Sequence, residues 1–181
     1  LNGCIERFRS DAKAEGDLVT IGGYETFDAA GSPIVHADAR WFFLKLERST
    51  AHWAFTKGEP FRTISSLEML GSLMGIMLLV NNDGNDESFY RGCLSVGALT
   101  DNSGNRFALA RMLTTKWPLV AFLAELATQM ESKQVLFEMH WVPRDENAEA
   151  DSFTNGDFHW LSPGRRIETS MGSLPFLILP Q

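Results

Sequence analysis

Alternating apolar and polar residues near the start of the chain predict short strands. We place them at Cys4–Ser10, Leu18–Thr26 and Arg40–Glu47. Turn-forming residues separate them at Glu15-Gly16-Asp17 and at Ala30-Gly31-Ser32-Pro33. Strands joined by such short turns run antiparallel, so this part of the sequence predicts a three-stranded meander.

The next segment changes to the period of a helix. Apolar residues recur every three or four positions from Thr63 to about Val80, which predicts a buried helix. Glu68 shares one side of this helix with the small residues Gly71, Ser72 and Gly75. Small residues let a helix backbone approach a sheet closely, so we expect this side to face the strands.

The remaining sequence predicts two more strands joined by helices. Cys93–Leu99 is a run of small and apolar residues typical of a strand covered on both faces, and Val135–Val142 predicts another strand. Helices are expected at Ser103–Leu113 and Pro118–Glu131, and Asn147 can cap a short helix after the last strand. Helical crossovers favour parallel strands. The pattern therefore predicts an α/β fold with a mixed five-stranded sheet, three antiparallel strands and then parallel ones, flanked by helices.

Several segments fall outside these elements. Ser49–Phe61 is assigned to a hairpin or loop, and the acidic run Asn81–Glu87 to an exposed loop. The tail Gly156–Gln181 either docks its apolar end on the core or begins a connection to another module. The sequence starts at Leu1, so we expect a piece of a longer protein.

Length, charge and cysteine content narrow the classes of function. At 181 residues the chain suits one domain. Its formal net charge of −7 provides no basic excess for gripping nucleic acid by the phosphates, so any nucleic-acid contact must be local. Cys4 and Cys93 form neither a disulfide framework nor a zinc spacing.

Membrane and secretory signals are weak. The longest uncharged apolar stretch, Gly71–Val80, is far shorter than the ~20 residues that cross a bilayer. The N-terminus carries no signal-like apolar segment. We therefore expect no membrane partner and no secretion, but an intracellular location in the cytoplasm or nucleus. No small-molecule cofactor is expected.

Acidic residues occupy four positions where a carboxylate is unusual. Asp101 follows the buried strand, at the end where parallel sheets present ligand sites. Asp11 closes the first strand, Glu68 interrupts an apolar helix, and Asp151 is preceded by alanine in the last helix. Burying such groups is costly unless cations or donors compensate. Such acids also have structural explanations. For example, Asp101 can cap the next helix, and Glu68 can pair with an arginine.

The motifs around these acids follow a specific order. They are Ser10-Asp11-Ala12 with Ile21-Gly22-Gly23-Tyr24, Ser66-Leu67-Glu68-Met69-Leu70, Leu99-Thr100-Asp101-Asn102, His140-Trp141-Val142-Pro143, and Asn147-Ala148-Glu149-Ala150-Asp151. In this order the sequence resembles the ribonuclease H-like domains of retroelement reverse transcriptases. The resemblance implies a ribonuclease H-like domain over residues 1–155 and leaves residues 156–181 as a C-terminal tail or connection.

The same resemblance implies a site and a reaction. Asp11, Glu68, Asp101 and Asp151 match the catalytic, metal-binding acids of the family. Crowded carboxylates repel one another unless divalent cations neutralise them, and oxygen ligands without Cys or His favour Mg²⁺, here two ions, with Mn²⁺ as the alternative. The implied activity is that of a metal-dependent endoribonuclease, which hydrolyses the RNA strand of an RNA/DNA hybrid. Its context would be a reverse transcriptase polyprotein, with the polymerase domain as a partner.

Other residues are secondary candidates. Asn102, Ser103 and Arg106 could contact nucleic acid, although helix capping and a solvated helix face explain them equally well. His140 and His159 could transfer a proton or assist product release, although a strand histidine beside a tryptophan is also explained by packing.

Departures from the family pattern leave two rival functions open. Lys13 stands where a small polar residue usually follows Asp-Ala, and it could compete for a metal ligand. Arg144 replaces a common glycine, and Phe153-Thr154-Asn155 replaces Leu-Ser-Arg; neither change removes a carboxylate. The first rival is a catalytically inactive ribonuclease H-like scaffold that supports a polymerase. The second is a 3′-5′ exonuclease. Such enzymes usually carry an Asp-x-Glu pair on the first strand, and this function is disfavoured because Lys13 stands at the position of the glutamate.

Overall fold

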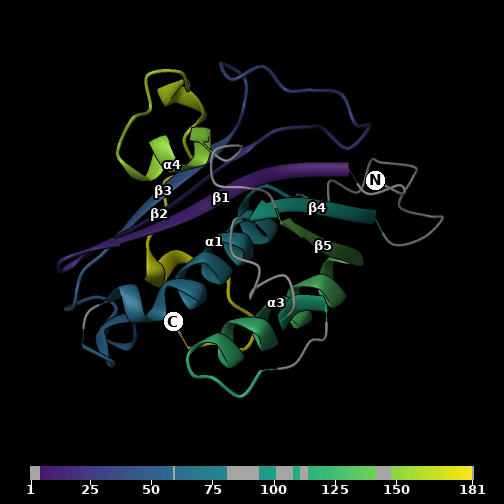
Figure 1. Ribbon diagram of the computed structural model, residues 1–181. Coiled ribbons are helices and arrows are strands. Elements are labelled where there is room, and N and C mark those ends of the chain that lie inside the picture. Colours follow the sequence, from purple (N-terminus) through teal and green to yellow (C-terminus); the bar gives the residue numbers. More distant parts are fainter. Residues whose placement is uncertain are drawn as a thin grey trace.

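Strands dominate the first part of the chain, and helices separate the later ones (Figure 1). A computed structural model describes residues 5–58, 60–80, 94–100, 108–110, 114–141 and 148–180. The strands are β1 (Ile5–Glu15), β2 (Leu18–Glu25), β3 (Trp41–Leu46), β4 (Leu94–Thr100) and β5 (Val135–Trp141). The helices are α1 (Ile64–Leu78), α3 (Leu119–Lys133) and α4 (Ala148–Thr154), with short 3₁₀ turns elsewhere.

The strands form one sheet in the order β3-β2-β1-β4-β5. β2 pairs antiparallel with both β1 and β3, as the short turns require. β4 pairs parallel with both β1 and β5. The predicted α/β class, with three antiparallel strands followed by helices, is confirmed.

The first strand is longer than predicted. It was expected to end at Ser10, but β1 continues to Glu15, which pairs with Leu18 across a tight turn. Gly16 occupies this turn with a φ of +58°, a left-handed conformation that glycine adopts at little cost. Because the hairpin stays paired up to the turn, Asp11 lies inside the strand and not at its end.

The segment before α1 is not a hairpin. The described part of residues 49–61 contains two single turns of 3₁₀ helix, His52–Phe55 and Pro60–Thr63. Ala51, Ala54 and Phe55 are buried there. Their spacing of three to four residues suits a helical turn packed on the core, which is why no strand pair forms.

Some predicted elements lie outside the described residues. These are the acidic run Asn81–Glu87, the cap Asn147 and most of the helix expected at Ser103–Leu113, of which residues 108–110 are described and helical. Within the described ranges, no helix is long and apolar enough to cross a membrane.

The two faces of β1 belong to different layers. Phe8 and Ala12 are buried in the larger core with α1, and Ser10 between them faces the same helix. Arg9, Asp11 and Lys13 therefore point to the opposite face, where α4 lies. In Figure 1, α1 and α3 cover one side of the sheet and α4 covers the other.

Helix α1 approaches β1 closely because its contact side is made of small residues. A Cβ atom at Gly75 would lie 2.2 Å from the Phe8 ring, and one at Gly71 would lie 3.5 Å from Ser10 Cβ. Phe8 is itself fully buried and stacks on Phe137, so its ring has little freedom to move. The predicted close approach of this side to the sheet is confirmed.

A buried carboxylate fastens the C-terminal segment to α3. Glu125 is fully buried and accepts hydrogen bonds from the backbone N–H groups of Leu177, Ile178 and Leu179 at 2.8–3.0 Å. Gln129 donates to the same carboxylate, and Leu174 is buried in the larger core. Burial alone would raise the pKa of Glu125, but these donors outweigh it and hold the pKa below its ordinary value. The apolar end of the chain therefore packs on the core, while a domain boundary after residue 155 stays a prediction.

We expect Glu125→Gln to lower the free energy of unfolding by about 1–3 kcal/mol at pH 7, because buried donors lose a charged acceptor. A lowered folded-state pKa stabilises the fold above the unfolded pKa, near 4.5, and this contribution is lost as pH falls through the folded-state value. The stability difference between parent and variant, measured by urea unfolding, should therefore shrink below that pH. Glu131→Gln, at an exposed site on the same helix, is the matched control. A difference that persisted unchanged to about pH 3 would contradict this assignment.

Candidate functional site

The site is built around Asp11 on β1 and the short helix α4 above it. The register of β1 and β2 places Gly22 directly opposite Asp11. Directly opposed residues of antiparallel strands point to the same face, so the missing side chain of Gly22 leaves a notch beside Asp11.

Phe153 of α4 fills this notch. A Cβ atom at Gly22 would lie only 2.2 Å from Phe153 Cδ1. Phe153 is 1% exposed and belongs to a second core between α4 and the sheet, separate from the core under α1. The aromatic residues around it are Tyr24, Trp41, Phe43, Phe158 and Trp160. This packing fixes the height of α4 above Asp11.

Hydrogen bonds then join the last turn of α4 to β1. The Thr154 hydroxyl donates to Asp11 Oδ2 at 3.0 Å, and Asn155 Nδ2 donates to the backbone oxygen of Asp151 at 2.8 Å. Lys13 Nζ donates to Asn155 Oδ1 at 2.7 Å and lies 2.9 Å from Glu15 Oε2. The structure therefore brings Asp11 and the helix that carries Asp151 together, with Lys13 held by Asn155 and Glu15.

The first turn of α4 is held by a buried phenol. Tyr24 is 1% exposed and donates its hydroxyl to Glu149 Oε2 at 2.8 Å. Burial and this carboxylate both raise the pKa of Tyr24 far above its ordinary value, so the phenol stays protonated as a donor. α4 is thus fixed in its first turn through Glu149 and in its last turn through Phe153 and Thr154.

Glu68 belongs to helix α1, on the face of the sheet opposite α4 (Figure 1). It lies on α1 one turn before Gly71, where an added Cβ atom would lie 3.5 Å from Ser10, the residue that precedes Asp11. The pairing of β1 with β4 ends at Arg9 opposite Leu99. Beyond that pair, the described strand pairing of β1 is with β2, and it continues to Glu15.

The remaining predicted acid lies outside the described residues. Asp101 directly follows Thr100, the last residue of β4, and Asn102, Ser103 and Arg106 are likewise not described. Among the side chains that are described, no three of Asp, Glu, His or Cys form a group able to hold a metal ion. The donors that are present, the carboxylates of half-buried Asp11 and exposed Asp151, are hard oxygen ligands, which fit Mg²⁺ or Mn²⁺.

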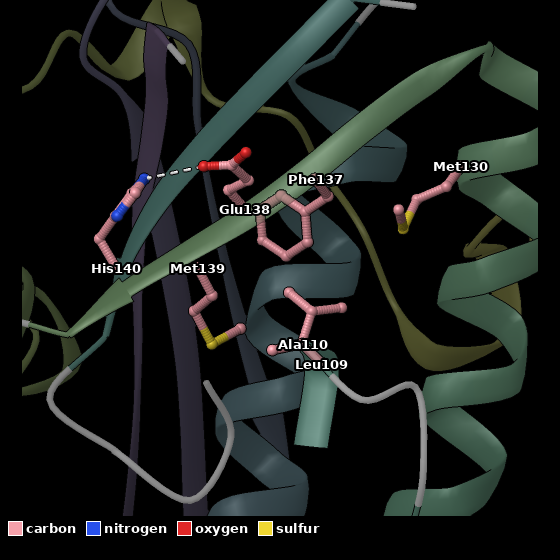
Figure 2. A pocket seen from close by; sticks show the side chains of 7 residues that line it. All are labelled: Leu109, Ala110, Met130, Phe137, Glu138, Met139 and His140. Atoms are coloured by element: carbon pink, nitrogen blue, oxygen red, sulfur yellow. Dashed lines mark ion pairs between the residues drawn. The ribbon is translucent and has the colours of Figure 1, made fainter. Parts of the chain in front are cut away.

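His140 lies on β5, in the same row of the sheet as Arg9. Leu99 pairs with both residues, so His140 stands two strands from β1, on the order of 10 Å away. Its Nε2 atom is buried 3.7 Å from Glu138 Oε2 and has no hydrogen-bond partner in the described part of the chain. This pair lies beside a cavity of about 340 Å³, which is otherwise lined mainly by Leu109, Met130, Phe137 and Met139. Figure 2 shows these side chains around the cavity.

His159 lies in the loop after α4. Its Nδ1 atom contacts Asp157 Oδ1, and this hydrogen bond lowers the pKa of Asp157 below its ordinary value. The imidazole is 80% exposed. Roles for His140 and His159 in proton transfer or product release stay predictions.

Sequence reasoning missed Gly22, Phe153, Thr154 and Asn155 as parts of the site. Gly22 was available in principle, because counting outward from the turn at Gly16 places it opposite Asp11. The other three were noted only as departures from the family pattern. Their contacts depend on where α4 lies over the sheet, and no local signal in the sequence specifies that.

Comparison with solved structures identifies the fold. LC11-RNase H1, isolated from compost by a metagenomic approach, superposes with a TM-score of 0.55 at 18% identity, covering 82% of this chain and 91% of that chain. The same protein in complex with an RNA/DNA hybrid gives 0.54 at 14% identity, covering 83% and 94%. The N-terminal RNase H domain of a Mycobacterium tuberculosis protein, solved as a fusion with maltose-binding protein, gives 0.52 at 18% identity, covering 82% and 89%.

No protein-family model and no curated protein matches the sequence. At these low identities the structural similarity establishes the fold. The chain has a ribonuclease H-like fold, as the order of its motifs predicted.

We expect Gly22→Ala to lower the free energy of unfolding by about 1–3 kcal/mol, because the added methyl group overlaps the immobile Phe153 ring. Gly172→Ala is the control, since a Cβ there would meet no atom within 4 Å. Urea unfolding of both variants measures the effect, and the control should stay within about 0.5 kcal/mol of the parent. Equal stability of the two variants would show that Phe153 does not depend on the notch.

Proposed function

We propose that this protein is a metal-dependent endoribonuclease that hydrolyses the RNA strand of RNA/DNA hybrids. The proposal rests on the ribonuclease H-like fold and on four acids, Asp11, Glu68, Asp101 and Asp151, as its catalytic groups and metal ligands. The similar structure of LC11-RNase H1 holds an RNA/DNA hybrid, which supports this class of substrate.

One observation carries the proposal most directly: the parallel register of β1 and β4. Arg9 lies opposite Leu99, and Asp11 and Asp101 each follow two residues later in their own segments. A register that continued past Thr100 would bring Asp101 beside Asp11. Carboxylates side by side on adjacent strands could together hold divalent cations.

The other two acids approach from the helical layers. Asp151 belongs to α4, whose last turn is hydrogen-bonded to Asp11. Glu68 comes from α1, whose next turn, at Gly71, packs closely over the residue before Asp11. The supporting point is that both helices are fixed closely on β1, one on each side of the sheet, next to the place where the described β1–β4 pairing ends.

The chemistry suits oxygen ligands of this kind. When bound, two Mg²⁺ ions would activate a water molecule, hold the scissile phosphate and stabilise the departing 3′-oxygen in an in-line displacement. The role of the protein is to hold its carboxylates in place before the ions arrive. Thr154, Tyr24 and Phe153 supply that rigidity here.

Binding of the substrate is expected to need contacts from outside the domain. With a formal net charge of −7, the chain is poorly suited to hold a hybrid through phosphates alone. We propose that it works inside the cell as part of a retroelement reverse transcriptase polyprotein, where a linked polymerase domain raises the effective concentration of the hybrid. Asn102, Ser103 and Arg106 are proposed local contacts, and His140 and His159 are proposed to aid proton transfer or product release.

A catalytically inactive scaffold is the alternative function. Its main support in the sequence is Lys13, an ammonium two residues from Asp11. In the structure this ammonium donates to Asn155 and pairs with Glu15, so it has two partners other than the carboxylate of Asp11. The position of Lys13 therefore favours the enzyme over the scaffold.

The test is cleavage of a labelled RNA/DNA hybrid with Mg²⁺ by the parent and by Asp101→Asn. Loss of a group that merely supports a metal ligand costs about 10- to 100-fold, so loss of a ligand should lower kcat/KM by more than about 100-fold. Asp17→Asn, at an exposed turn, should cleave like the parent. Equal cleavage by the parent and Asp101→Asn would remove Asp101 from the mechanism, and absence of cleavage by the parent would favour the scaffold.

A further inference from the structure

The hydroxyl of Thr154 joins helix α4 to the side chain of Asp11. Its Oγ1 atom lies 3.0 Å from Asp11 Oδ2 and also 3.0 Å from the backbone oxygen of Asp151. A hydroxyl has a single hydrogen to donate, so these two acceptors compete for it.

Asn155 settles this competition. Its Nδ2 atom donates to the same backbone oxygen of Asp151 at 2.8 Å, closer than Thr154 does. The Asp151 carbonyl is therefore satisfied without the threonine. The hydrogen of Thr154 is free to go to the Asp11 carboxylate, the stronger acceptor because it carries charge.

The position of this hydroxyl is fixed by its surroundings. Thr154 is 3% exposed, and its backbone oxygen accepts a hydrogen bond from the Thr20 hydroxyl at 2.9 Å. Thr20 lies on β2, on the face that carries α4, and the preceding residue, Phe153, fills the notch at Gly22. A threonine side chain has one rotatable bond before its hydroxyl, so fixing the backbone nearly fixes the donor.

We propose that Thr154 is a positioning residue that orients the Asp11 carboxylate for a divalent cation. The inference rests on the proposed function, in which Asp11 is a metal ligand. A carboxylate turns easily about its terminal bond, and a fixed donor on Oδ2 restricts that rotation before the cation binds. Ordering a ligand in advance raises affinity because less freedom is lost on binding.

The experiment compares Thr154→Val, which keeps the shape but removes the hydroxyl, with Thr154→Ser, which keeps the hydroxyl. Thr128→Val is the matched control, because Thr128 donates to a helix carbonyl, that of Ala124, on the distant helix α3. Mn²⁺ binding to each protein without nucleic acid is followed by electron paramagnetic resonance. In parallel, kcat and KM for a labelled hybrid are measured at saturating Mg²⁺.

Thr154→Val should weaken Mn²⁺ binding about tenfold and lower kcat about 10- to 100-fold, the range found for groups that support a metal ligand. KM for the hybrid should change less than about twofold, because Thr154 is 3% exposed and a buried hydroxyl offers little surface to the substrate. Thr154→Ser and Thr128→Val should stay within about twofold of the parent in every measurement. In an Asp11→Asn background, Thr154→Val should cause no further loss, since its partner is already gone.

Other results would overturn the inference. Mn²⁺ binding and kcat equal to those of the parent would show that Asp11 does not need the hydroxyl. Equal losses in Thr154→Val and Thr128→Val, or a loss that Thr154→Ser does not restore, would show a merely structural effect. If Thr154→Val does not fold, Thr154→Ala takes its place in each comparison.

The two proposals fail separately. A parent that cleaves the hybrid while Thr154→Val matches it overturns the role of Thr154 alone. A parent that binds Mn²⁺ but cleaves no hybrid overturns the proposed function, and the Mn²⁺ comparison still decides the role of Thr154. A parent that does neither overturns both.

Discussion

The packing of Phe153 against Gly22 is the contact on which the site depends. Gly22 stands opposite Asp11 in the β1–β2 hairpin, and its missing side chain is the space that the ring occupies. Without that space α4 would sit higher, and the hydroxyl of Thr154 would lie beyond hydrogen-bonding reach of Asp11. A packing constraint in an apolar layer thereby sets the geometry of a polar group at its edge.

The alternation of β1 distributes the site between two layers. Ser10 faces α1 and Asp11 faces α4, so the helices that carry Glu68 and Asp151 are held on opposite sides of the sheet. The described pairing of β1 with β4 ends at Arg9, two residues before Asp11. We propose that the acids of the two layers converge next to this end of the described pairing.

Much of this architecture could be predicted from periodicity and turn chemistry. The three-stranded meander, the long apolar helix and its contact side at Gly71 and Gly75 follow from local pattern. The extent of β1 was underestimated, since a hairpin keeps pairing up to its turn whatever the hydrophobicity of the last residues. The supporting groups Thr154 and Asn155 were not predictable, because their partners lie more than a hundred residues away and depend on how α4 is packed.

The proposed function requires that carboxylates from separate elements converge on Asp11 and share divalent cations. A crystal structure of the protein grown with Mn²⁺, with anomalous scattering recorded for the metal, tests it most directly. Anomalous peaks are expected within ligand distance of carboxylate oxygens of Asp11 and Asp101, with Glu68 and Asp151 beside them. Carboxylates directed away from one another, with no peak next to Asp11, would contradict it.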